Sequence, residues 1–177
     1  MRRCTVGLHV NFKFHFFQLL TVSENLCIAM LAGRARMLDF FKPSALRWRN
    51  TKQSEQLATT NLPLLDAMDT PASDLPQGHR QFLEFAITAA SESRVLLLDE
   101  PCAGLSPAET KLMTSIVRSY QDRTDGIIIL IEHDMSILRD LADHVVVMHQ
   151  GAVLAECGYD DIREDAAVKA VYERGTK

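Results

Sequence analysis

The stretch RVLLLDEPCAGLSPAE, residues 94–109, decides the fold. Its apolar run, VLLL at 95–98, ends in two adjacent carboxylates, Asp99 and Glu100, which Pro101 follows. A short uninterrupted apolar run indicates a strand that is covered on both faces, as in a parallel sheet. Carboxylates directly after such a strand suit a divalent cation and the polarisation of water. The stretch therefore predicts an α/β sheet with a reaction site at its edge.

Two further apolar runs follow the same pattern. IIILI occupies 127–131 and ends in Glu132, His133 and Asp134, and VVVM occupies 145–148. The segments between the runs have apolar residues at helical spacing, and the first begins with Ser106 as N-cap and Pro107 at the first helical position. Alternating strands and helices predict a parallel sheet with right-handed crossovers. Ligands of such sheets bind beyond the carboxyl ends of the strands, where Asp99, Glu100 and His133 are expected.

The remaining segments complete a division into three parts. The segment 21–41 predicts a helix with Ser23 as N-cap, and 46–69 predicts another helix. After 148, HQG predicts a tight turn into a strand, AVLAE, and the tail IREDAAVKAVYER predicts a helix. We expect a remnant of the core at 1–22, a helical subdomain at 23–73 and the rest of the core at 74–177.

Composition and charge limit the class of protein. The chain has 177 residues, 47% hydrophobic and 24% charged, which is ordinary for one soluble globular domain. Residues 1–60 carry nine Lys/Arg and three Asp/Glu, a balance of +6, and the remainder carries ten and twenty, a balance of −10. We interpret the basic residues as a solvated helix face and expect no nucleic acid partner.

The cysteines and the apolar runs indicate the compartment. The four cysteines form no CxxC pair, which favours free thiols in a reducing compartment over a zinc site or a disulfide framework. The sequence contains no run of 18 apolar residues, so we expect no transmembrane helix. Polar residues interrupt the N-terminal apolar segment, so we do not interpret it as a signal peptide.

Several motifs in order resemble the ATP-binding subunits of ABC transporters. LLLDEP resembles the Walker B motif with its catalytic glutamate, AGLSPAE the D-loop, and IEHDM the switch-histidine segment. LPQGHRQFLEFA, residues 75–86, falls where the family has its signature loop, and TVSENLCIAM resembles the entry to the helical subdomain after the Q-loop. The resemblance extends from about Gly7 to Tyr172. HQGAVLAE and AVYERG are most similar to the branched-chain amino acid and urea uptake branch.

The resemblance implies a fold, ligands and partners. The fold is that of a P-loop NTPase, a parallel sheet with a helical subdomain. The ligands are ATP and Mg²⁺: Asp99 would hold Mg²⁺, Glu100 would be the general base, and His133 would contact the γ-phosphate. The nucleotide-binding candidates are Lys13, Pro76, Gln77, Gly78, His79 and Ser106. Those in the signature loop of this chain would contact ATP that the opposite subunit holds. Partners would be a second ATP-binding subunit and transmembrane permease subunits, with the chain in the cytoplasm on the inner face of the plasma membrane.

The chain also departs from the family pattern. Pro76 stands where the signature serine is usual, His79 where glutamine is common, and Ser106 where the D-loop has aspartate or asparagine. Lys13 occupies the position of the Q-loop glutamine, with Gln18 as a rival. None of the eight glycines is followed by lysine, so the 177 residues contain no GxxxxGK[ST] phosphate loop. The N-terminal half of the nucleotide site is thus missing, through truncation, a fragmentary gene model or a degenerate gene. We expect an N-terminally truncated cassette with open apolar faces, which aggregates or needs a partner.

Three functions agree with this pattern. The leading one is the ATP-binding and ATP-hydrolysing subunit of an importer for an amino acid or urea. The alternative is a non-catalytic module that keeps partner binding without autonomous ATPase activity, which the missing phosphate loop, Pro76 and Lys13 favour. A DNA-repair or chromosome-structure ATPase ranks last, because the chain has no sustained heptads.

Overall fold

The computed structural model describes residues 8–10, 16–34, 63–90 and 93–175. The chain divides into two compact units, Met1–Ile131 and Glu132–Lys177. Within the described residues, the first unit contains a three-stranded sheet and the second a two-stranded sheet. The division between the units falls inside the predicted part 74–177, and the predicted boundaries at residues 22 and 73 stay predictions.

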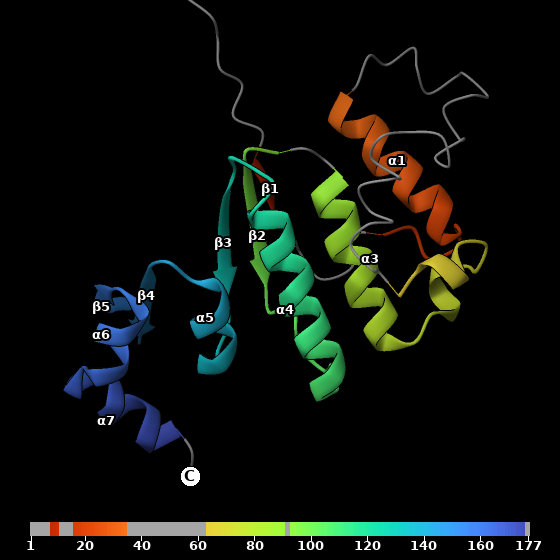
Figure 1. Ribbon diagram of the computed structural model, residues 1–177. Helices are drawn as coiled ribbons and strands as arrows, with labels where there is room; N and C mark the ends of the chain where they lie inside the picture. The colour runs from red at the N-terminus through yellow and green to blue at the C-terminus, as the bar shows by residue number, and fades with distance from the viewer. Residues whose placement is uncertain (1–7, 11–15, 35–62, 91–92, 176–177) are drawn as a thin grey trace, which may run out of the picture. The chain divides into compact units, whose positions relative to one another are not determined.

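The sheet of the first unit is parallel, as expected. Its order is β1 (Leu8–Val10), β2 (Val95–Asp99) and β3 (Ile127–Ile131), and Figure 1 shows β2 between its two neighbours. In the register, Val95 lies between Leu8 and Ile127. The predicted strands at 95–98 and 127–131 are therefore confirmed, and their pairing is parallel.

The two faces of this sheet differ in burial. On one face of β2, Leu96 and Leu98 are each only 1% exposed. On β3, Ile127, Ile129 and Ile131 are 63%, 49% and 59% exposed. The prediction that the apolar runs are covered on both faces is thus wrong for β3, because no described element buries these isoleucines.

Two helices pack beside the sheet. α3 (Gln77–Ala90) contacts β2 and α4 (Pro107–Gln121), and Figure 1 shows α3 and α4 side by side. The rings of Phe85 and Tyr120 meet edge to face, with centroids 5.9 Å apart, and so join the two helices. α4 starts as predicted, with Ser106 as N-cap and Pro107 in the first turn.

A third helix packs on α3. α1 (Val22–Arg34) buries Val22, Leu26 and Met30 and contacts α3. The predicted N-cap, Ser23, is wrong. Thr21 caps the helix instead. Its hydroxyl accepts from the Glu24 N–H at 3.3 Å, and its own N–H donates to Glu24 Oε2 at 2.8 Å.

The other helical predictions before α3 have mixed outcomes. The predicted continuation to Phe41, and most of the helix predicted at 46–69, lie outside the described residues. For the described residues 63–69 the predicted regular helix is wrong, because this segment forms only a 3-10 turn, η4 (Leu65–Ala67). Proline at 63 and 71 brackets this segment and restricts helix growth. A second 3-10 turn, η5 (Ala72–Asp74), leads towards α3.

The second unit begins with α5 (Met135–Leu141) and continues into a hairpin of β4 (Val145–His149) and β5 (Ala152–Cys157). β4 pairs with β5 in antiparallel orientation. The predicted parallel placement of 145–148 is therefore wrong among the described strands, whereas the predicted turn and following strand are confirmed. The turn residues Gln150 and Gly151 both have positive φ, at 50° and 80°, which suits a two-residue hairpin.

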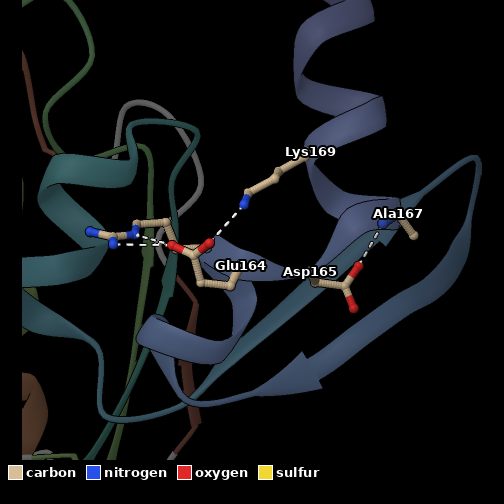
Figure 2. Close-up of polar contacts among 5 residues, drawn as sticks. Glu164, Asp165, Ala167 and Lys169 are labelled. Carbon is tan, nitrogen blue, oxygen red and sulfur yellow. Dashed lines mark hydrogen bonds and ion pairs between the residues drawn. The ribbon is translucent and has the colours of Figure 1, made fainter.

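The predicted tail helix is two helices, α6 (Tyr159–Glu164) and α7 (Ala166–Gly175). Asp165 interrupts them and caps α7: its Oδ1 accepts from the N–H groups of Ala167 at 2.8 Å and Val168 at 3.0 Å. Figure 2 shows this cap beside the ion pair of Glu164 with Lys169, 2.7 Å long. The core of this unit contains the buried residues Val145, Ile162 and Val168.

Two further features concern the helices and the cysteines. Across the described ranges, no helix is long and apolar enough to cross a bilayer. Cys27 and Cys102 are buried and Cys157 is half-buried, and none of these three described cysteines is in a disulfide.

The unequal faces of the sheet can be tested with two substitutions. Leu98→Ala in β2 should lower the free energy of unfolding by about 2–5 kcal/mol, because it leaves a cavity. Ile129→Thr in β3 should change it by about 1 kcal/mol or less and reduce aggregation, because it removes exposed apolar surface. Urea unfolding measures the first effect and light scattering the second. Equal destabilisation by both, or unchanged scattering in Ile129→Thr, contradicts the faces described.

Candidate functional site

The two adjacent carboxylates lie at the carboxyl end of β2. Asp99 is the last residue of the strand, is exposed, and pairs in register with Ile131 of β3. The Glu100 N–H donates to the Ile131 carbonyl at 2.9 Å, so the pairing with β3 continues one residue past β2. Both carboxylates therefore start from backbone that the sheet holds in place.

Glu100 has an unusual backbone. Its φ is +47°, in the left-handed region, which costs a residue other than glycine roughly 1–2 kcal/mol. Its carbonyl accepts from the Ala103 N–H at 3.0 Å, and Gly104 follows with φ +75°. Strain of this kind persists where surrounding contacts over-determine it and clusters at functional sites. The turn from Glu100 to Gly104 thus sets the direction of the Glu100 side chain.

The signature-like candidates lie at the start of α3. Pro76 and Gln77 are exposed, Gly78 is buried, and His79 is half-buried. The first N–H groups of a helix have no partner within it, so this turn offers backbone donors to an anion. Pro76 contributes its carbonyl to the helix, which accepts from the Arg80 N–H at 3.1 Å.

Arg80 secures the segment that enters α3, and the sequence analysis missed it. Its Nε donates to the Leu75 carbonyl at 2.9 Å and its Nη2 to the Ser73 carbonyl at 2.7 Å. These carbonyls lie just before the helix, so the guanidinium fixes the approach to Pro76. No local pattern could have identified this role, because a helix-surface arginine usually points to solvent.

The start of α3 lies against the turn that follows Glu100. Gln81 Nε2 donates to the Ala103 carbonyl at 3.4 Å. A β-carbon built on Gly104 would lie 2.5 Å from Gln77 Nε2, so the end of the Gln77 side chain would have to move, and the positive φ of Gly104 also favours glycine. The structure therefore brings Gln77 and the segment 103–106 together, although they are separated in sequence by α3 and β2.

Ser106 forms a capping box with Glu109 at the start of α4. The Ser106 N–H and hydroxyl donate to Glu109 Oε2 at 2.8 Å and 2.6 Å, and the Glu109 N–H returns to the Ser106 hydroxyl at 3.4 Å. These bonds from Ser106 lower the pKa of Glu109 below its usual value. The Ser-x-x-Glu spacing could have identified Glu109, but only Ser106 was singled out from the sequence.

His133 belongs to the second unit. It is exposed and lies two residues beyond the end of β3 in the chain. Its neighbour Asp134 is the N-cap of α5 and accepts from the Ser136 N–H at 2.8 Å and hydroxyl at 2.6 Å. Hydrogen bonds from Ser136 are the main cause that lowers the pKa of Asp134, and His133 makes a smaller contribution in the same direction.

The Q-loop candidates have different outcomes. Lys13 lies outside the described residues, so its role stays a prediction. Gln18, its rival, is exposed in the turn before α1, and its carbonyl accepts from the Ser73 N–H at 2.9 Å.

The donor set limits how a metal or nucleotide could bind. In the described part of the chain, no three His, Cys, Asp or Glu side chains gather into a metal site. Mg²⁺ does not need such a cage, because it is usually bound by one or two carboxylates together with phosphate oxygens and water. The exposed carboxylate of Asp99 fits that mode. Its site therefore suits Mg²⁺ that arrives with a nucleotide, not Mg²⁺ alone.

Comparison with known families finds a match to the model described as ABC transporter, over residues 2–103. The chain is 32% identical over 160 residues to LivG, the high-affinity branched-chain amino acid transport ATP-binding protein of Salmonella typhimurium. It is also 32% identical over 167 residues to BraF, a protein with the same description from Pseudomonas aeruginosa. Each alignment covers 88% of this chain and 63% of the relative, so the chain spans less than two thirds of their length.

Solved structures agree on the fold. A crystal structure of an ATP-binding cassette of an ABC transporter in its ADP conformation is similar with a TM-score of 0.63 at 24% identity. A nucleotide-free ATP-binding cassette gives 0.60 at the same identity, and both comparisons cover 88% of this chain and 63% of the other. At this identity the likeness shows the fold alone. The predicted α/β, P-loop NTPase-like fold is confirmed.

The strained backbone of Glu100 can be tested by substitution. Glu100→Gly should be as stable as the wild type within about 1 kcal/mol, because glycine adopts positive φ freely. Glu100→Val should be less stable than Glu100→Gly by about 1–2 kcal/mol. Urea unfolding compares them. As the matched control, Asp122 has φ −64°, so valine should be tolerated there at least as well as glycine; the same order at both positions would refute the strain.

The Asp134 cap should make α5 sensitive to acid. The folded-state pKa of Asp134 is lowered, so its contribution is complete above the unfolded-state pKa of about 4 and is lost as the pH falls through the folded-state value. Asp134→Asn keeps a capping side chain that does not titrate. Thermal unfolding between pH 7 and pH 3 should show a larger loss for the wild type than for Asp134→Asn. Parallel pH curves would show that the cap does not depend on charge.

Proposed function

This chain belongs to the ABC transporter family, and we propose that it acts as an ATP-binding and ATP-hydrolysing subunit of an importer. The observation that carries the proposal is the Asp99–Glu100 pair at the carboxyl end of β2, with Glu100 held at positive φ. Two adjacent carboxylates on an ordered turn suit a metal-assisted attack of water on a phosphoryl group.

Each candidate has a role in this reaction. Asp99 would hold Mg²⁺ together with the phosphate oxygens of ATP, and the bound ion would polarise the terminal phosphoryl group. Glu100 would accept the proton of the attacking water as general base. His133 would donate a hydrogen bond to the γ-phosphate. The exposure of Asp99 and His133 is compatible with direct contact to a ligand.

The start of α3 and Ser106 would contact nucleotide held by a second subunit. Gln77, Gly78 and His79 offer the backbone N–H groups of the first turn, which favour an anion through hydrogen bonds and the helix dipole. Pro76 has no hydroxyl for the ligand, so this contact depends on backbone donors. Lys13 would reach a phosphate as a point charge.

The partners and the solute follow from the relatives. LivG and BraF are described as transporting branched-chain amino acids, so we propose a branched-chain amino acid as the solute class. The partners would be a second ATP-binding subunit and membrane permease subunits, with the chain peripheral on the cytoplasmic face. Within the proposed division, the helical part 23–73 would dock on the permease and 1–22 and 74–177 would form the nucleotide-binding core.

The proposal predicts a specific loss in Glu100→Gln. MgATP binding and turnover are measured for the purified chain, alone and co-expressed with a permease. Glu100→Gln should lower turnover by about 10²–10⁴-fold, the usual share of general base catalysis, and keep MgATP binding. Asp99→Asn should weaken the Mg²⁺ dependence of binding. Asp160→Asn, an exposed carboxylate in the first turn of α6, is the matched control and should leave turnover unchanged.

Two outcomes would overturn parts of the proposal. If neither the chain alone nor its complex binds MgATP, the chain is not an ATP-binding subunit. If MgATP binds but turnover is absent or indifferent to Glu100→Gln, the chain is a non-catalytic module.

A further inference from the structure

The carboxylate of Glu109 lies at the start of two helices at once. In α4 it closes the capping box with Ser106 through Oε2. Its other oxygen, Oε1, faces Gly78, the second residue of α3. A β-carbon built on Gly78 would overlap Oε1 and lie 2.9 Å from the Glu109 Cδ. A side chain at residue 78 would therefore require the end of the Glu109 side chain to move out of this position.

The charge of Glu109 favours this arrangement. The N-terminus of a helix carries unpaired N–H groups and a positive partial charge, so one carboxylate stabilises the starts of both α3 and α4. The pKa of Glu109 is lowered chiefly by Ser106, and the nearby His79 of α3 acts in the same direction. The Nδ1 of His79 is buried and has no hydrogen-bond partner among the described residues.

Further contacts extend the link to Glu100. Gln81 donates to the Ala103 carbonyl, and Gln77 lies against Gly104. Ala103 in turn donates its N–H to the Glu100 carbonyl at 3.0 Å. A displacement of the first turn of α3 would therefore reach the backbone of Glu100 through one hydrogen-bonded turn.

We propose that Glu109 is a positioning residue that couples the first turn of α3 to the turn following Glu100. Its functional meaning rests on the function proposed above, in which the first segment contacts nucleotide and the second carries the general base. Glu109 would then hold the first turn of α3 in a fixed position relative to the turn following Glu100, so that a ligand bound at one segment affects the position of the other.

A double-mutant cycle tests the contact itself. Gly78→Ala should lower the Tm of the full chain by about 2–8 °C, because its methyl group overlaps the Glu109 carboxylate. In a Glu109→Ala background the same change should have no effect or raise the Tm, since the space is free and alanine is the better helix residue. An equal Tm loss in both backgrounds would overturn the contact.

Amide hydrogen exchange tests the coupling. Glu109→Ala should speed exchange in peptides covering 77–85 about two- to fivefold, in addition to its effect on the first turn of α4. Ser106→Ala is the matched control: the Ser106 N–H still holds Glu109, so only the α4 peptide should change. Asp165→Ala removes the cap of α7 and should leave both peptides unchanged. If Glu109→Ala alters only α4, the residue is an ordinary cap and the proposal fails.

Glu109→Gln separates charge from shape. It keeps an oxygen that can accept from Ser106 but loses the negative charge that attracts α3. Exchange at 77–85 should lie between the wild type and Glu109→Ala; a wild-type value would show that charge is not the cause. These measurements need no nucleotide, so a chain that shows the coupling but binds no MgATP would refute the proposed function alone.

Discussion

The parallel pairing of β2 with β3 is the constraint on which the rest of the first unit depends. It puts Asp99 opposite Ile131, and the Ile131 carbonyl then receives the Glu100 N–H, one residue beyond the strand. Without this bond, Glu100 would be part of an ordinary loop. With it, the chain must reverse sharply, and Glu100 takes positive φ so that Gly104 and Ser106 can lead into α4.

The same turn serves as a platform for the start of α3. Two glycines permit the approach, Gly104 beside Gln77 and Gly78 beside Glu109. At each glycine the absent side chain leaves room for the end of a polar side chain from the other segment. Elements that carry different candidate residues therefore share one packed junction, which the capping box of Ser106 and Glu109 completes.

The described part of the chain leaves an apolar surface on β3 exposed. Parallel strands of this composition are normally covered on both faces, because their side chains gain little from water. Here Leu96 and Leu98 are buried, while alternate isoleucines of β3 are about half exposed or more. The chain also spans 63% of the length of its relatives.

The sequence by itself determined the strands at 95–98 and 127–131, the cap of α4 and the family, because apolar runs, Ser-Pro at a helix start and the LLLDEP and IEHDM motifs are local patterns. It misplaced the cap of α1 and the pairing of β4, because Thr21 and Ser23 are both common N-cap residue types and an apolar run fits a hairpin as well as a crossover. Only the tertiary structure decided which face of β3 stays open, the strained φ of Glu100 and the meeting of Gly78 with Glu109. These features depend on contacts between segments far apart in the chain, and no local pattern records such contacts.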